Sequence, residues 1–119
     1  FRRVLFRSEI GGHIVTGHVD AVGEVTRKEP DGDSWRVEIR APASLAPFIA
    51  PKGSITVQGV SLTVNDLRDE DDGACTFMLN IIPHTGEVTT LGALRSGDEV
   101  NLEIDVLARY LKRMQALAG

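Results

Sequence analysis

Two histidines are the first residues of this sequence whose type and spacing could do chemistry. His13 and His18 lie five positions apart in the segment GGHIVTGHVD. An imidazole titrates near neutral pH, so either side chain could move a proton, although a hydrogen-bonded structural histidine is the common alternative. In a regular strand an odd offset places two side chains on opposite faces, and Cys75 and His84 lie far along the chain. The spacing therefore does not favour a zinc site.

A pair of hydroxyl residues forms the second group with possible chemistry. Ser61 and Thr63 lie two positions apart in the segment GVSLTV, which places both hydroxyls on one face of a strand. Gly59, just before them, lets another group approach the backbone closely. Two such hydroxyls are often packed inside a protein, but they also suit a polar heterocycle whose edges carry amide groups. The sequence predicts one of these two arrangements.

Strands must position both groups, because β-branched residues recur in short runs separated by turn residues. The sequence predicts six strands, over residues 13–26, 35–40, 54–57, 60–67, 75–82 and 98–104. The first two are expected to form a hairpin that turns at residues 30–33, and residues 43–50 to hold a short helical turn between two prolines. The acidic run 69–72 is expected to be a solvated hairpin tip. Six strands without intervening helices predict an all-β fold, a small closed antiparallel barrel.

The apolar period lengthens after Asp105 to three and four residues, which predicts a C-terminal α-helix. The apolar positions are Val106, Leu107, Tyr110, Leu111, Met114, Leu117 and Ala118. Asp105 is placed to cap the first turn with its carboxylate. The apolar stripe could cover the barrel of its own chain or pack against the same helix of other subunits.

Composition excludes several classes of protein. The chain has 119 residues, a net charge of −4 and one cysteine, which fit one domain without a disulfide. It has no apolar run of the roughly 20 residues needed to span a membrane and no secretory leader, so we expect a cytoplasmic location. Nucleic acid is a poor partner for an acidic chain with few aromatic residues. Residues 1–8 carry three arginines and no acid, and are expected to be a basic arm, a linker remnant or a non-native extension.

Four segments in order closely resemble the C-terminal barrel of riboflavin synthase: GGHIVTGHVD, KGSITVQGVSLTV, NIIPHTGEVTTLG and GDEVNLEIDVLARYL. The resemblance covers residues 8–114, and its length makes chance similarity improbable. It implies a six-stranded Greek-key barrel over residues 9–105 and an oligomerisation helix over residues 106–119, which joins three subunits in the full-length enzyme.

The same resemblance implies an activity. Members of the family dismutate two molecules of 6,7-dimethyl-8-ribityllumazine to riboflavin and 5-amino-6-ribitylaminopyrimidinedione, without a metal or organic cofactor. Each active site lies between the C-terminal barrel of one subunit and the N-terminal barrel of a neighbouring subunit. Since the N-terminal barrel is missing here, little turnover is expected of this chain alone. A non-catalytic antenna-type protein that holds lumazine or flavin is the alternative.

Residue roles also follow from the resemblance. His18 and His13 match histidines near the reacting lumazine, where an imidazole could help remove a proton from the C7 methyl group. Asp105 is a further catalytic candidate besides its role as a helix cap. The candidates for substrate binding are Thr16, Gly17, Lys52, Gly59, Ser61, Thr63, Ile82 and Thr85. Gln58 stands where the family commonly has an acid.

Overall fold

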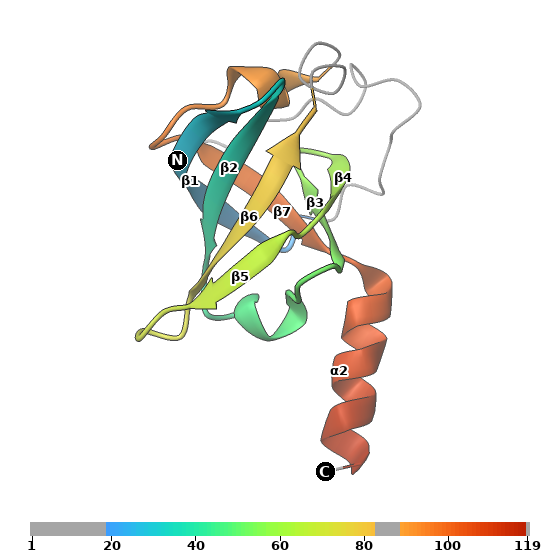
Figure 1. Ribbon diagram of the computed structural model, residues 1–119. Helices are drawn as coiled ribbons and strands as arrows, with labels where there is room; N and C mark the ends of the chain where they lie inside the picture. Colours follow the sequence, from blue (N-terminus) through green and yellow to red (C-terminus); the bar gives the residue numbers. More distant parts are fainter. Residues whose placement is uncertain (1–18, 83–88, 119) are drawn as a thin grey trace.

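A computed structural model describes residues 19–82 and 89–118, which form a curled antiparallel sheet and a C-terminal helix (Figure 1). The strands are β1 (Ala21–Asp31), β2 (Ser34–Ala41), β3 (Ser54–Val57), β4 (Val60–Thr63), β5 (Asp66–Asp69), β6 (Cys75–Ile81) and β7 (Glu99–Ile104). Two short 3-10 turns, η2 (Ala46–Phe48) and η3 (Thr90–Ala93), and the helix α2 (Val106–Ala118) complete this part of the chain. The arm predicted over residues 1–8 and the candidates His13, Thr16, Gly17, His18 and Thr85 lie outside the described residues.

The sheet is barrel-like because its two outermost strands follow one another in the chain. The strand order is β4-β3-β7-β1-β2-β6-β5, so β4 and β5 form the two edges. Only Val64 and Asn65 join them. The Val64 amide donates to the Gly53 carbonyl next to β3 (2.8 Å), and the Asn65 amide donates to the Met78 carbonyl of β6 (2.8 Å). The sheet therefore curls until its edges approach each other at this link.

The same link corrects the predicted strand count. The sequence predicted one strand over residues 60–67, but the chain changes partner at Val64 and Asn65. Before the change, Thr63 of β4 lies opposite Ser54 of β3; after it, Asp66 of β5 lies opposite Met78 of β6. The described residues thus form seven strands, and the prediction of six was wrong, because alternation along the sequence does not show a change of partner.

The β1–β2 hairpin turns later than predicted. Strand β1 continues through Pro30, which pairs with Trp35, and the turn is reduced to Gly32 and Asp33. Gly32 has φ +63°, a conformation that favours glycine. Pro30 is tolerated because β1 pairs with β7 only over residues 21–24, so at Pro30 no second described strand needs its missing N–H.

Other predicted elements are confirmed. The short helical turn between the prolines is η2, and the acidic run begins at Asp69, the last residue of β5, and continues into the loop that joins β5 to β6. Alternating residues of the strands fill the core, in which the largest side chain with no exposed surface is Phe77. Residues of β1, β2, β3, β6 and β7 pack around it, together with Leu45 and Ile49 on either side of η2 and Leu91 of η3.

Helix α2 extends away from the sheet (Figure 1). Its apolar stripe is exposed by 51–71%, at Leu107, Tyr110, Leu111, Met114 and Leu117. The helix therefore does not cover its own barrel, and that alternative was wrong. None of the described helices combines the length and the apolar character needed to cross a membrane.

Three contacts fix the start of α2. The Asp105 carboxylate accepts a hydrogen bond from the Leu107 amide (3.0 Å), which confirms the predicted N-cap. The Arg109 guanidinium forms an ion pair with Asp20 and lies 5.5 Å from the ring centroid of Phe48 in η2. The two contacts of Arg109 hold the first turn of the helix against the barrel.

Candidate functional site

Four hydroxyl side chains form a two-by-two patch on the β3–β4 hairpin. Ser54 lies opposite Thr63, and Thr56 lies opposite Ser61. Directly opposed residues on antiparallel strands place their Cβ atoms about 5 Å apart, so a single small molecule can contact all four. We call these four residues the hydroxyl face. Two of them were predicted; Ser54 and Thr56 were missed, although they repeat the Ser-x-Thr spacing of Ser61 and Thr63.

The hydroxyl face lies on the outside of the barrel. Val57 and Val60 of the same hairpin are buried in the core, whereas Ser54, Ser61 and Thr63 are exposed and Thr56 is 8% exposed. The prediction that Ser61 and Thr63 share a face is confirmed, and the alternative of a pair packed in the core was wrong. No described residue makes a hydrogen bond with the side-chain hydroxyl of any of the four. The exposed hydroxyls of Ser54, Ser61 and Thr63 can therefore donate to and accept from a ligand, and Thr56 lies beside them with little exposed surface.

A buried carboxylate borders the hydroxyl face. Glu103 of β7 lies opposite Thr56 and is 7% exposed. Its neighbours Leu102 and Ile104 point into the core, so Glu103 points to the outer side. Glu103 was not predicted as a site residue, because the pairing of β3 with β7 joins segments far apart in the chain.

The turn of the hairpin closes one end of the hydroxyl face. Gln58 and Gly59 form a two-residue turn with φ values of +53° and +84°, the pattern of a type I′ turn. The positive φ is a conformational reason for glycine at position 59. Gln58 is buried, and its side-chain Oε1 accepts a hydrogen bond from the Asn101 amide of β7 (2.5 Å).

The two predicted charged residues lie at the other end. Lys52 is exposed in the turn before β3, where its amide donates to the Val64 carbonyl (2.7 Å). Asp105 directly follows Ile104, which lies opposite Ile55, so Asp105 is next to Ser54 along the ladder. The structure thus brings Lys52 and Asp105 to the end of the hairpin that carries Ser54 and Thr63.

Ile82 lies at the same end of the barrel as Gly59. Four antiparallel steps separate β3 from β6, so the two strands run in the same direction. Ile82, 53% exposed, follows the end of β6, and Gly59 follows the end of β3. Lys52 and Asp105 therefore lie at the Ser54–Thr63 end of the hairpin, and Ile82 lies after β6 at the end of the barrel where Gly59 lies.

Cys75 takes no part in this arrangement. It lies in the core at the start of β6, and burial, followed by the carboxylates of Asp69 and Glu70, raises the pKa of its thiol to about 11. A neutral buried thiol is a poor nucleophile. Within the described ranges, no three histidine, cysteine or acidic residues are grouped in a way that could hold a metal ion.

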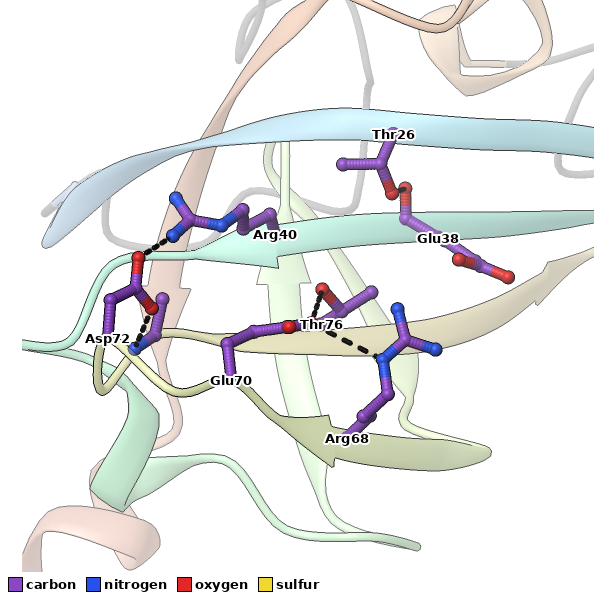
Figure 2. Close-up of polar contacts among 8 residues, drawn as sticks. Thr26, Glu38, Arg40, Arg68, Glu70, Asp72 and Thr76 are labelled. Carbon is purple, nitrogen blue, oxygen red and sulfur yellow. Dashed lines mark hydrogen bonds and ion pairs between the residues drawn. The ribbon is translucent and has the colours of Figure 1, made fainter.

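The outer face of β2, β6 and β5 has a different character (Figure 2). Arg40 pairs with Asp72, and Glu70 accepts from both Arg68 (3.3 Å) and the Thr76 hydroxyl (2.8 Å). The pKa of Asp72 is lowered, mainly by the hydrogen bond from the Ala74 amide and also by Arg40. A hollow of about 210 Å³ next to Arg40 is lined by residues of β1, β2 and β7 and lies away from the hydroxyl face.

Comparison with known proteins identifies the family. Residues 16–105 match the lumazine binding domain. The chain belongs to this family. It is 46% identical over 113 residues to riboflavin synthase of Brucella abortus (strain 2308), a match that covers 95% of this chain and 54% of the relative. It is 47% identical over 119 residues to riboflavin synthase of Mycobacterium tuberculosis (strain ATCC 25618 / H37Rv), with coverage of 99% and 58%.

Solved structures agree with this assignment. LumP complexed with 6,7-dimethyl-8-(1'-D-ribityl) lumazine has a TM-score of 0.67 and 27% identity, covering 80% of this chain and 51% of LumP. LumP complexed with riboflavin also has a TM-score of 0.67, with 26% identity and coverage of 88% and 52%. The resemblance to riboflavin synthase seen in the sequence is thereby confirmed. This lumazine-binding domain spans little more than half the length of the riboflavin synthases it matches.

Proposed function

We propose that the hydroxyl face binds 6,7-dimethyl-8-ribityllumazine and riboflavin as half of a riboflavin synthase active site. The observation that carries the proposal is the juxtaposition of Ser54, Thr56, Ser61 and Thr63, whose hydroxyls have no described hydrogen-bond partner. The ring of a lumazine presents carbonyl and ring-nitrogen groups along its edge, which need donors and acceptors at close spacing. The similarity to LumP bound to the same lumazine supports this ligand class.

The length of the hairpin fits a ligand that consists of a ring and a chain. A four-residue strand spans about 13 Å. In the proposed pose Ser61 and Thr63 hold the ring edge, and Ile82 contacts the ring from the Gly59 end. Lys52 and Asp105, at the opposite end, bind the ribityl chain or the second lumazine.

The proposed reaction is the dismutation of two lumazines. One molecule gives up its four-carbon unit and leaves as 5-amino-6-ribitylaminopyrimidinedione, while the other gains that unit and becomes riboflavin. His18, with His13, is proposed to take the proton from the acidic C7 methyl group. The lumazine ring delocalises the resulting carbanion, so the protein's main tasks are orientation and proton transfer, and we propose no metal or organic cofactor.

A second barrel is needed to hold the second lumazine. We propose that the N-terminal barrel of a neighbouring subunit supplies it, and that the exposed stripe of α2 packs against the same helix in a trimer. Five large apolar side chains exposed on one helix support an interface there. Turnover by this chain alone is therefore expected to be low.

The strand order supports the finer description of the fold. If β4 and β5 count as one bent strand, β7, β3, β4–β5 and β6 lie side by side in the order of a Greek key. We propose a barrel over residues 9–105, an oligomerisation helix over residues 106–119 and an accessory segment over residues 1–8. A cytoplasmic location is proposed because the one cysteine is a free thiol buried in the core.

Two measurements test the function. Fluorescence titration with 6,7-dimethyl-8-ribityllumazine should show saturable binding, and riboflavin should bind in competition. Prolonged incubation with the lumazine should release little riboflavin, and addition of an N-terminal barrel of a riboflavin synthase should increase the rate. Absence of saturable binding would overturn the proposal. Tight binding without any gain in rate on addition of the second barrel would favour a non-catalytic antenna-type protein, the alternative that the sequence leaves open.

A further inference from the structure

The hairpin that carries the hydroxyl face is tethered to the barrel by few contacts. Strand β4 is an edge strand that pairs only with β3 among the described strands. Strand β3 is joined to β7 by three residue pairs, the last of which is Val57 with Leu102. The position of the hydroxyl face relative to Glu103 therefore depends on the length of the short β3–β7 ladder, and in particular on how close to the turn its hydrogen bonds continue.

Gln58 extends the β3–β7 ladder by one residue pair beyond Val57, although Gln58 is already the first residue of the hairpin turn. In a regular antiparallel pair, Gln58 and Asn101 would exchange two backbone hydrogen bonds. The first is present, since the Gln58 amide donates to the Asn101 carbonyl (2.9 Å). The second is made differently: the Asn101 amide donates to the side-chain Oε1 of Gln58 at 2.5 Å. A side-chain amide thus takes the place of the backbone carbonyl that the turn carries away.

The burial and the backbone conformation of Gln58 show why this hydrogen bond is not easily replaced. The residue is 5% exposed, so water gives little replacement for a lost acceptor. Its φ of +53° belongs to the left-handed region, which glutamine enters at a cost. Gln58 thus adopts an unfavourable backbone conformation at the position where its side chain completes the β3–β7 ladder.

We infer that Gln58 is a positioning residue for the ligand site. Its side chain fixes the turn of the β3–β4 hairpin against β7 and so holds Thr56 and Ser61 in line with Glu103. It does this without belonging to the hydroxyl face. The part of this inference that concerns the ligand rests on the proposed function, whereas the part that concerns the hairpin does not.

The test compares two substitutions at Gln58 with a matched control. Gln58→Met keeps the length of the side chain but removes the acceptor, and Gln58→Glu keeps an acceptor oxygen. Gln115→Met makes the same exchange on the exposed surface of α2, away from the hairpin. The readouts are hydrogen exchange of the Asn101 amide and of the hairpin amides, and the Kd for 6,7-dimethyl-8-ribityllumazine.

In Gln58→Met the Asn101 amide should exchange about tenfold faster and the lumazine Kd should rise about tenfold, the size expected for one lost hydrogen bond. Gln58→Glu should stay within about threefold of the wild type in both readouts. The control Gln115→Met should give the same exchange rate and the same Kd as the wild type. Unchanged affinity in a folded Gln58→Met protein would overturn the role in ligand positioning. Unchanged exchange at Asn101 would overturn the hydrogen bond itself.

One measurement on the unaltered protein covers the case in which Gln58→Met does not fold. The hydrogen bond predicts a scalar coupling by NMR between the Asn101 amide nitrogen and the side-chain carbonyl carbon of Gln58. Absence of this coupling contradicts the inference. If the wild type binds no lumazine, the proposed function fails, and the coupling and the exchange of the hairpin amides still decide whether Gln58 holds the hairpin.

Discussion

The two halves of the curled sheet present opposite kinds of outer surface. On β2, β6 and β5, arginines pair with acidic residues of the same surface, as Arg40 does with Asp72 and Arg68 with Glu70 (Figure 2). On the β3–β4 hairpin, the outer residues are the four uncharged hydroxyls. The strands differ as well: β1 and β2 have 11 and 8 residues, whereas β3 and β4 have four each.

We interpret this difference as a separation between the part that holds the fold and the part that we propose binds the ligand. Charged groups are costly to remove from water, so a face of ion pairs resists being covered by a neutral ligand. Hydroxyl groups lose less hydration free energy than charged groups when a ligand covers them, and hydrogen bonds to the ligand compensate for that loss. Strands β2 and β6 supply many core side chains, among them Phe77, and the outer side of the short hairpin provides polar groups that are not already used. Substitutions in the two halves should therefore have separable effects on stability and on binding.

The largest effect is expected in the core beneath the ion-pair face. Phe77→Ala in β6 should lower the free energy of unfolding by about 3–5 kcal/mol, because Phe77 has no exposed surface and its removal leaves a cavity. Leu62→Ala in β4 should cost only about 1 kcal/mol, since Leu62 is partly exposed at the edge of the core. Denaturant unfolding measures both. Equal losses would contradict the division between the two halves.

The next largest effect is on stability at alkaline pH. The pKa of Cys75 in the folded protein is about 11, against an ordinary value of 9.0. Below pH 9 both states keep the thiol proton, and stability does not depend on it. Between pH 9 and pH 11 the unfolded state loses the proton while the folded state keeps it, so stability falls by roughly 2–3 kcal/mol. Urea unfolding of Cys75→Ala should lack this part of the loss; identical pH dependence would contradict the burial of the thiol.

A comparable free energy is expected for binding at the hydroxyl face. The double substitution Ser61→Ala and Thr63→Val should weaken lumazine binding about 30-fold, the loss of two hydrogen bonds of about 1 kcal/mol each. The free energy of unfolding should change by less than about 0.5 kcal/mol, because both side chains are exposed. The matched control, Arg68→Met on the ion-pair face, should leave the Kd unchanged. A weaker affinity in the control would show that binding is not confined to the hairpin.

The smallest effect is expected at Thr76 of β6. Its hydroxyl donates to the Glu70 carboxylate at 2.8 Å, and Thr76→Val removes this bond with little change of volume. We expect a loss of about 1 kcal/mol in the free energy of unfolding, and none in lumazine affinity. Calorimetry and the binding titration check the two parts. A change in affinity would mean that the two halves of the sheet are coupled.

Local patterns predicted the parts of this molecule that depend on neighbours in the chain. The common face of Ser61 and Thr63 follows from their spacing, and the start of α2 follows from Asp105 and the apolar stripe behind it. The acidic tip between β5 and β6 follows from four acids between two strands. Each of these features is decided within a few residues.

Features that depend on strand pairing could not be predicted in the same way. Nothing in the sequence places Glu103 beside Thr56 or the Asn101 amide beside Gln58, because the register of β3 on β7 is set by the packing of the whole barrel. The division of residues 60–67 into β4 and β5 was missed for the same reason. The direction of α2 depends on contacts of Arg109 with Asp20 and Phe48, which are distant in sequence.

The most direct test of the central claim is to map lumazine binding on the amide spectrum of the protein. Titration with 6,7-dimethyl-8-ribityllumazine, followed by NMR, should shift amides of β3, β4 and the end of β7, with the largest changes around Ser54, Thr56, Ser61 and Thr63. Amides on the ion-pair face, around Arg40 and Arg68, should stay in place. Shifts centred on the ion-pair face, with the hairpin unaffected, would contradict the account.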